Sequence, residues 1–357
     1  MKIKDRNLYY VGGVVRDEML GVTSIDTDYC YEGDAIEFSK KFNVMKTNPD
    51  FGTVRVQNNG EEIDIASTRT ETYPKKGHLP VLDKIGCVIV DDLKRRDFTI
   101  NAMAKNTLTG EVLDYFGGRD DLNNKKIRVL HKESFIDDPT RIVRGLKFAV
   151  RFGFELESQT KTLQDDYLKN INYDMSYHRL KKELIETFNL NKNIALEKFI
   201  EQGIFKLLGV NQKNPTIIAN IESLIDKYLP KNIWLVYLGM FDLSNFELNC
   251  EEQEIIDSYN KIKTQNPTDD YGIYKMFKGI PLESVLLYAI TINLDVAINY
   301  LDNLSKIKIE LDGNDLKGLG VKQGKVYSEI FEYLMKEKIK NPNLSKTQEI
   351  ELVKSFL

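Results

Sequence analysis

The stretch RRDFTINAMA, residues 95–104, decides how this chain is interpreted. It follows an Asp-Asp pair at 91–92 and carries too many polar groups for a short element of a buried core. Arg96 can bind a triphosphate and Asp97 a ribose hydroxyl. Asn101 lies four residues further on and is therefore expected on the same helical face as Asp97. The simpler interpretation is a helix start that Asp97 caps, with solvated arginines, but it does not explain the whole string.

A Gly-Gly turn at Gly12 and Gly13 lies upstream of this stretch. Residues 8–14 are expected to form a strand that runs into the turn, and residues 14–20 a helix that follows it. Glycines allow backbone N–H groups to approach a phosphate at a helix N-terminus, where the helix dipole also favours an anion. Arg16, one turn into the helix, can add a charged donor. The alternative is a tight turn with a surface arginine.

Asp26 and Asp28 lie two residues apart in a strand expected over residues 25–32, so both side chains leave the same face. Close carboxylates repel one another unless a cation lies between them, and oxygen ligands suit Mg²⁺. Asp64 is expected in a hairpin over 53–65, pointing away from the apolar neighbours, and can be a third ligand. Such a set can hold two metals for an in-line attack on a nucleotide α-phosphate. The alternative is a solvated strand edge.

Asp138 and Arg141 are three residues apart at the start of an expected helix, on the side opposite its apolar face. A carboxylate accepts a hydrogen bond from an exocyclic amine, and a guanidinium donates one to a ring nitrogen. Cytosine and adenine fit this pair on their Watson–Crick edges, whereas uracil and guanine present the opposite pattern. The alternative is a surface ion pair. Arg144 and Lys147 continue at similar spacing and can bind phosphate or form a solvated basic face.

The fold class expected from these patterns is α+β. A mixed sheet with helices occupies the N-terminal third, and from about residue 134 the pattern is helical to the end. Residues 72–92 contain Pro74, Gly77 and Pro80, which predict a loop. The polar, Gly-rich stretch 312–324 is expected to introduce a last small unit.

Composition restricts the class of protein further. The 357 residues have room for two or more domains. The net charge of −4 argues against a uniformly basic surface but not against a nucleic-acid partner. Three isolated cysteines without a C-x-x-C pair suit a reducing cytoplasm and exclude a Cys-based zinc module. The sequence has no apolar run long enough to span a bilayer.

Taken together, these motifs resemble the class II tRNA nucleotidyltransferases, the CCA-adding enzymes. The related bacterial poly(A) polymerases share most of the motifs, and the resemblance is poor over residues 205–305. In chain order the strings are Gly12-Gly13-x-x-Arg16-Asp17, Asp26-x-Asp28, Arg95 to Ala102, Phe116 to Leu122, Asp138-Pro139-x-Arg141-x-x-Arg144, Ser176-x-x-Arg179-x-x-x-Glu183 and Leu311 to Gly324.

The resemblance implies a head with a nucleotidyltransferase-type mixed sheet, followed by an all-helical neck, body and tail. We expect the catalytic head at 1–133, a base-recognising neck at 134–200, the body at 201–305 and a tRNA-binding tail at 306–357. The implied metal is Mg²⁺ and the implied substrates are ATP and CTP. The implied partner is tRNA, contacted at its 3′ end and its acceptor and elbow region. No protein partner or membrane is indicated.

The resemblance also assigns residues. Asp26 and Asp28 are the implied metal ligands and, with Asp64 as the candidate third ligand, the expected catalytic residues. Lys147 stands where the family often has arginine, and Asp137 replaces its usual glutamate. The expected nucleotide-binding residues are Gly12, Gly13, Arg16, Arg96, Asp97, Asn101, Asp138, Arg141, Arg144 and Lys147.

Full CCA addition is the predicted activity, and alternatives stay open within the family. The expected loop over 72–92 is long enough to be the flexible element that CC-only enzymes lack, which favours CCA addition or A addition alone. Poly(A) polymerases carry a Gly-basic-basic-Phe segment that residues 33–53 do not contain. A hypothesis of another class is a non-catalytic tRNA-binding protein, against which the retained Asp26 and Asp28 argue.

Overall fold

A computed structural model describes residues 3–23, 28–58 and 60–356. The described chain divides into two compact units, one of residues 1–212 with 244–246 and the other of residues 213–243 with 247–357. The predicted division into four parts is finer than this and stays a prediction. Within the described residues, no helix is long and apolar enough to cross a membrane.

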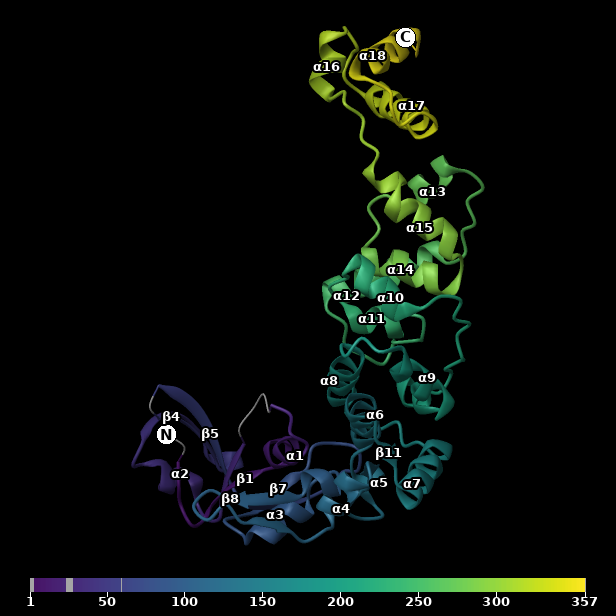
Figure 1. Ribbon diagram of the computed structural model, residues 1–357. Helices are drawn as coiled ribbons and strands as arrows, with labels where there is room; N and C mark the ends of the chain where they lie inside the picture. The colour runs from purple at the N-terminus through teal and green to yellow at the C-terminus, as the bar shows by residue number, and fades with distance from the viewer. Residues whose placement is uncertain (1–2, 24–27, 59, 357) are drawn as a thin grey trace. The chain divides into compact units, whose positions relative to one another are not determined.

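The first unit is built on a seven-stranded mixed sheet of order β3-β4-β5-β2-β1-β8-β9 (Figure 1). Its β2 and β5 are parallel, and its other neighbours are antiparallel. The predicted α+β class is confirmed. The strands are β1 (Leu8–Val11), β2 (Tyr29–Tyr31), β3 (Asn43–Asn48), β4 (Thr53–Asn58), β5 (Glu61–Ser67), β8 (Met103–Asn106) and β9 (Val112–Asp114).

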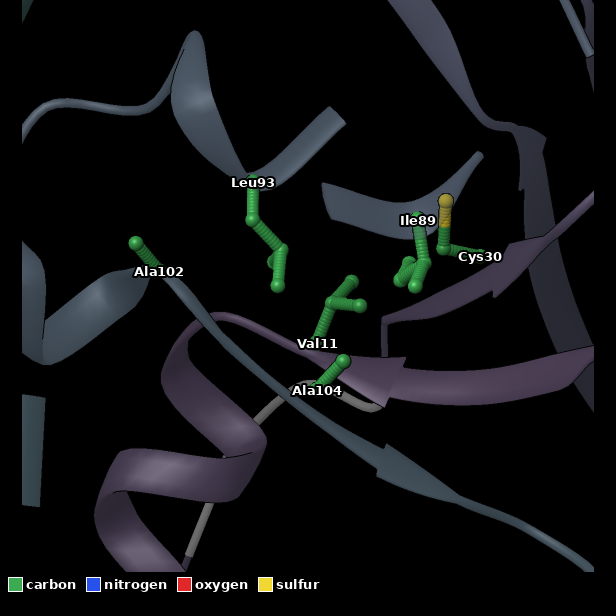
Figure 2. Packing of buried hydrophobic residues seen from close by; sticks show 6 residues of the cluster. All are labelled: Val11, Cys30, Ile89, Leu93, Ala102 and Ala104. Atoms are coloured by element: carbon green, nitrogen blue, oxygen red, sulfur yellow. The ribbon is translucent and has the colours of Figure 1, made fainter. Parts of the chain in front are cut away.

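Short helices cover the sheet. Side chains of α3 pack on Val11, Cys30 and Ala104 from three adjacent strands. Figure 2 shows Val11 and Ala104 beneath Leu93, and Cys30 beside Ile89. At the hairpin, α2 packs against β4 and β5. The helices of this part are α1 (Gly13–Met19), α2 (Ala35–Ser39), α3 (Ile89–Lys94) and α4 (Gly118–Asn123), with 3₁₀ turns η1 (Pro49–Phe51) and η2 (Thr99–Asn101).

Helices follow from residue 134, as predicted. In the middle of the first unit, α8 lies beside α6 (Figure 1). One exception is β11 (Glu155–Leu156), which pairs in parallel with β10 (Lys126–Ile127), so the predicted neck is not wholly helical. The helices of this part are α5 (Ser134–Asp137), α6 (Thr140–Phe152), α7 (Ser158–Lys169), α8 (Tyr177–Phe188) and α9 (Asn193–Glu201), followed by η3 (Ile204–Leu208).

The second unit is helical, and its C-terminal part has a core of its own. Leu316, Ile330 and Val353 belong to one buried cluster there. Asp312 caps the first helix of this part in a capping box with Asp315, which fixes where that helix begins. The elements are α10 (Ile221–Tyr228), α11 (Ile233–Leu238), α12 (Cys250–Ile262), α13 (Asp270–Phe277), α14 (Leu282–Thr291), α15 (Leu294–Asp302), η4 (Leu304–Lys306), α16 (Gly313–Gly318), α17 (Lys325–Lys340) and α18 (Lys346–Phe356).

Two local predictions need correction. Residues 72–92 are not a loop, because β6 (Arg69–Thr72) pairs with β7 (Val81–Ile85) and α3 begins at Ile89. The two prolines and the first glycine of this segment lie in the connection between the strands. The strands themselves are polar and partly exposed, so no apolar alternation marks them. The strand predicted over 25–32 is described only as Tyr29–Tyr31. Asp26 lies outside the described residues.

Candidate active site

The Gly-Gly turn forms as predicted between β1 and α1. Gly12 has φ +68°, a conformation that favours glycine, and a Cβ there would lie 2.9 Å from Nη1 of Arg96. Arg96 donates from Nη2 to Asp92 at 3.0 Å. Its Nε is buried and has no hydrogen-bond partner among the described residues. A buried donor of this kind next to a glycine turn is suited to an anionic ligand.

Asp28 directly precedes β2, and Asp64 lies in the parallel neighbouring strand β5. Tyr29 pairs with Ile65, and one step back along this register brings Asp28 opposite Asp64, about 4.8 Å away between strand axes. A hydrogen bond from the Val11 amide to the Asp28 carbonyl, 3.2 Å long, keeps this residue in the sheet. Both carboxylates are exposed, and they leave the face opposite to the buried Ile65.

Asp64 already has a protein partner. Arg55 donates to its two oxygens from Nε and Nη2, each at 2.8 Å. These hydrogen bonds lower the pKa of Asp64, which keeps it charged. The residues present fit a divalent metal, because the exposed carboxylates of Asp28 and Asp64 line one cavity and offer oxygen donors. The described residues contain no group of three acidic, His or Cys side chains placed to hold a metal, and Asp26 lies outside them.

A cavity of about 530 Å³ lies next to the turn, within the size range of small-molecule sites. We call it the arginine cavity because eight arginines line it: Arg16, Arg69, Arg95, Arg96, Arg141, Arg144, Arg151 and Arg179. Asp28 lines it too. So do all ten predicted nucleotide-binding residues, which are Gly12, Gly13, Arg16, Arg96, Asp97, Asn101, Asp138, Arg141, Arg144 and Lys147. Asp64 does not line this cavity.

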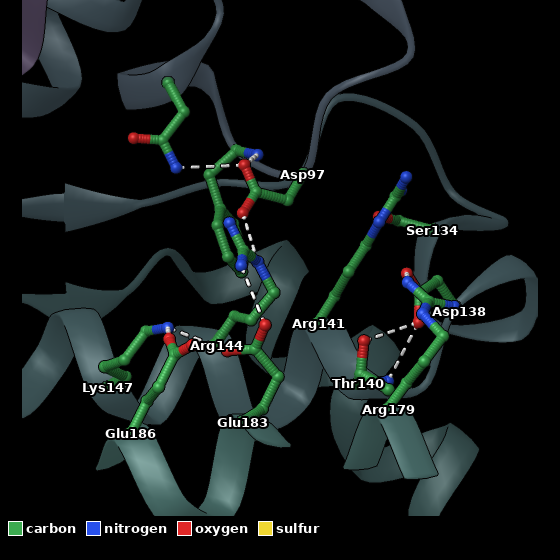
Figure 3. A network of polar contacts seen from close by, with 12 residues as sticks. Asp97, Ser134, Asp138, Thr140, Arg141, Arg144, Lys147, Arg179, Glu183 and Glu186 are labelled. Carbon is green, nitrogen blue, oxygen red and sulfur yellow. Dashed lines mark hydrogen bonds and ion pairs between the residues drawn. The ribbon is translucent and has the colours of Figure 1, made fainter. Parts of the chain in front are cut away.

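Asp97 is a buried member of the polar network in Figure 3. It accepts hydrogen bonds from Asn101 Nδ2 at 2.9 Å and from Arg144 Nε at 2.8 Å. The predicted proximity of Asp97 and Asn101 is therefore present, but the helix is not: Phe98 is extended, and only a 3₁₀ turn follows. Burial alone would raise the pKa of Asp97, but the charge of Arg144 and these hydrogen bonds lower it to about 2.

Asp138 and Arg141 lie in the same cavity but do not contact one another as an ion pair among the described residues. Asp138 precedes α6, and its carboxylate binds Thr140 and Arg179. Arg141 donates to Ser134 Oγ at 2.7 Å and to the Arg95 carbonyl at 3.1 Å. Asp138 and Arg141 are each only 4% exposed, so the interpretation as a surface ion pair is wrong.

Several side chains that line the cavity are held in place by neighbouring side chains. Arg16 is braced by Asp17 at 2.8 Å and by Asn101 at 2.6 Å. Arg144 and Lys147 share Glu183 of α8, at 2.9 and 2.7 Å (Figure 3). The alternative of a solvated basic face is therefore wrong for these two, because both are paired and at least partly buried.

Comparisons with known proteins agree with this geometry. The model of the poly A polymerase head domain matches residues 8–128. An A-adding tRNA nucleotidyltransferase of Halalkalibacterium halodurans is 30% identical over 98% of this chain and 88% of its own length. The chain belongs to the tRNA nucleotidyltransferase family. Nucleotidyltransferases of this family use a divalent metal.

Other relatives in the family differ in what they add. A CCA-adding enzyme of Ligilactobacillus salivarius is 27% identical over 92% of this chain and 87% of its own length. Among solved structures, a CCA-adding enzyme in an apo form has a TM-score of 0.81 at 27% identity, covering 98% of this chain and 92% of that one. The Thermotoga maritima CCA-adding enzyme in complex with tRNA has a TM-score of 0.74 at 25% identity, covering 98% and 91%.

Sequence reasoning did not assign the residues that brace this tRNA nucleotidyltransferase site. Arg179 holds Asp138, and Glu183 holds Arg144 and Lys147. Arg179 and Glu183 belong to a motif that was part of the resemblance but gave no role. Their spacing of four on α8 places them on one helical face, and this spacing could have indicated that both point towards the same site. Arg141 also donates from Nη2 to the hydroxyl of Tyr73 at 3.2 Å, and no sequence pattern indicated this contact.

The lowered pKa of Asp97 predicts that the free energy of unfolding depends on pH. An unfolded aspartate titrates near 3.9 and folded Asp97 near 2, so the carboxylate contributes about 2 kcal/mol of stability at neutral pH. This contribution is present above about pH 4 and is lost as the pH falls towards 2. We expect Asp97→Asn to be about 2 kcal/mol less stable than wild type at pH 7, with a difference that shrinks towards pH 2.

Calorimetric unfolding of both proteins from about pH 7 to about pH 2.5 measures this difference. Asp166→Asn is the matched control, because Asp166 pairs with Lys169 at a site where both side chains are more than 60% exposed. The control should follow wild type at every pH. A stability deficit of Asp97→Asn that does not change with pH would contradict the assignment.

Proposed function

We propose that this chain transfers CMP and AMP from CTP and ATP to the 3′ end of tRNA, without a nucleic-acid template, and so completes a CCA end. The observation that carries the proposal is the arginine cavity. Residues from separate segments of the sequence converge on it, and all ten predicted nucleotide-binding positions and Asp28 line it. Relatives solved with ATP, with CTP and with tRNA support the same substrates.

The side chains divide the work by chemistry. Arg96, which has an unpartnered Nε and places its Nη1 beside Gly12, is positioned to bind the triphosphate. Asp97, held ionised by Arg144, is placed to accept from a ribose hydroxyl. Asp138 and Arg141 read the Watson–Crick edge of the base. Because each is held by its own partners and not by the other, both side chains are oriented to contact a base.

The reaction forms a bond between the tRNA 3′-oxygen and the α-phosphorus and breaks the bond from that phosphorus to diphosphate. Asp28 and Asp26, with Asp64 as the third candidate, would hold Mg²⁺, which supplies a polarised hydroxyl and charge neutralisation at the phosphates. The residues of the chain orient the two reacting groups. The four-part division into head, neck, body and tail belongs to this proposal.

Addition of A alone is the second candidate. It is favoured by the A-adding relative that aligns over nearly the whole chain. Two further A-adding relatives, of Aquifex aeolicus and Geobacter sulfurreducens, are 30% and 28% identical, and this chain covers 44% of the length of each.

An incorporation assay separates these functions. The protein is incubated with three tRNAs that end at the discriminator base, at C and at CC, each with CTP alone, ATP alone or both. CCA addition extends all three to the full end. Addition of A alone extends only the tRNA that ends in CC, and repeated A addition indicates a poly(A) polymerase. No extension of any tRNA would revive the non-catalytic tRNA-binding protein.

The tail contributes to tRNA binding in this proposal. Lys317, Lys322 and Lys325 are exposed around the Gly-rich turns of α16. We expect their combined replacement by alanine to weaken tRNA binding and to lower the salt slope by roughly one for each lysine that contacts a phosphate. Binding of ATP and CTP should not change. Removal of residues 311–357 should likewise weaken tRNA binding and leave ATP and CTP binding unchanged. The rest of the chain should stay folded, since this part has its own core.

The measurement is tRNA affinity by filter binding or anisotropy at several salt concentrations. A tail that is only a helical cap with solvated lysines would behave differently. In that case the triple variant would keep both the affinity and the salt slope of the wild-type protein.

A further inference from the structure

A second cavity, of about 560 Å³, lies beside the arginine cavity on the face of the sheet that α3 partly covers. We call it the sheet cavity. It is lined mainly by β3, β4 and β5, and it shares Asp28, Arg69, Arg95 and Arg96 with the arginine cavity. Of the residues expected to bind the nucleotide, only Arg96 lines it. Asp28 therefore lines both cavities, and the nucleotide accounts for only the arginine cavity.

A row of charged side chains crosses the floor of the sheet cavity. Lys46 pairs in register with Arg55, Arg55 with Asp64, and Asp64 lies opposite Asp28. Residues paired in register point to the same face, so the row runs from two cations to two carboxylates. Val11 donates its amide to the Asp28 carbonyl, precedes the Gly-Gly turn and lines the same cavity. This order follows from strand register alone.

The cations of the row are available for a ligand. Lys46 is exposed and makes no hydrogen bond or ion pair with any residue that the structure describes. Arg55 binds Asp64 but is 48% exposed, so part of its guanidinium faces solvent. The strand that carries Lys46 is exposed along its whole length and forms the edge of the sheet. A polar, basic surface of this kind suits a phosphodiester backbone.

We propose that the sheet cavity binds the single-stranded 3′ end of the acceptor RNA, with Lys46 and Arg55 contacting its last phosphates. The inference rests on the proposed function. An in-line displacement requires the attacking hydroxyl on the side of the α-phosphate opposite the leaving diphosphate. With the nucleotide in the arginine cavity, the acceptor reaches Asp28 through the other cavity that this residue lines.

Lys46 is the cleaner residue to change, because Arg55 also holds Asp64. The test compares Lys46→Glu with wild type on an acceptor-stem RNA that ends in a single-stranded discriminator nucleotide. We expect the KM for RNA to rise roughly tenfold and the salt slope of RNA binding to fall by about 0.7 to 1. The KM for CTP and ATP should stay within about twofold, since Lys46 does not line the arginine cavity.

Two controls localise the effect. Lys40→Glu changes an exposed lysine at the end of α2 that lines neither cavity, and it should behave as wild type. An RNA whose single-stranded 3′ nucleotides are removed should bind wild type and Lys46→Glu equally. If the loss persists with this shortened RNA, Lys46 contacts another part of the acceptor and the inference is overturned.

The outcomes separate this inference from the proposed function. A wild-type protein that adds no nucleotide contradicts the proposed function, while the binding comparison still tests the cavity. An unchanged KM and salt slope for RNA in Lys46→Glu would overturn the inference. A raised KM for CTP and ATP instead would assign the basic row to the triphosphate and overturn it as well.

Discussion

Replacement of Asp28 by alanine is expected to lower nucleotide incorporation by roughly 10³-fold, because a bound metal stabilises the transition state by several kcal/mol. The protein should stay folded, since the Asp28 side chain is exposed and contributes nothing to the core. It should also bind tRNA as wild type does. The same loss is expected for Asp26→Ala. Incorporation is measured with Mg²⁺ as the only divalent ion.

Glu61→Ala is the matched control for this prediction. Glu61 is an exposed acid on the same strand as Asp64 but lines neither cavity. It should retain wild-type incorporation. Activity near wild type in a folded Asp28→Ala protein would remove Asp28 from the metal site and would leave the shared edge of the two cavities without a catalytic role.

Base choice should change in the double variant Asp138→Asn with Arg141→Asp, which reverses the hydrogen-bonding sense of the pair. An amide donates to O4 of uracil or O6 of guanine, and a carboxylate accepts from the adjacent ring N–H. A bidentate base contact is worth roughly 1–3 kcal/mol of discrimination, or about 5- to 150-fold. Incorporation of UTP or GTP should therefore rise relative to CTP and ATP.

The structure adds an expected cost to this variant. Shortening the side chain at position 141 removes the donors that bind Ser134 and the Arg95 carbonyl. An uncharged amide in place of the Asp138 carboxylate weakens the contact with Arg179. The total rate should fall even as the preference changes. Relative incorporation from an equimolar mixture of the four nucleotides measures the preference independently of the rate.

Glu186→Gln is the control for base choice, because Glu186 pairs with Lys147 at the outer end of the same network and does not line the cavity. It should keep wild-type ratios. Wild-type ratios in the folded double variant would mean that Asp138 and Arg141 position other groups and do not read the base.

The sequence predicted those elements in which apolar and polar residues alternate with a clear helical or strand period. The hairpin of β4 and β5 alternates buried and exposed residues along both strands, and α6 buries Ile142 and Leu146 as its spacing requires. The sequence did not mark the hairpin of β6 and β7 or the strand β3. Those strands bury almost nothing, and the pairing that forms them is a tertiary property.

The candidate site shows the same difference at the level of residues. Motif chemistry identified the groups that converge on the arginine cavity from segments far apart in the chain. It did not identify which residues brace one another: Asp138 pairs with Arg179, 41 residues away, and not with Arg141, three away. Asn101 reaches Asp97, but through an extended residue and a 3₁₀ turn. Long-range ion pairs follow from packing of α6 against α8, which no local pattern encodes.

The most direct test of the central claim is equilibrium binding of the four nucleoside triphosphates to the protein in Mg²⁺ without any RNA. In the proposed function the arginine cavity binds the nucleotide, and Asp138 and Arg141 select its base. CTP and ATP should then bind at least about fivefold more tightly than UTP and GTP, the lower end of what a bidentate base contact supplies. Equal affinity for all four nucleotides would contradict the account.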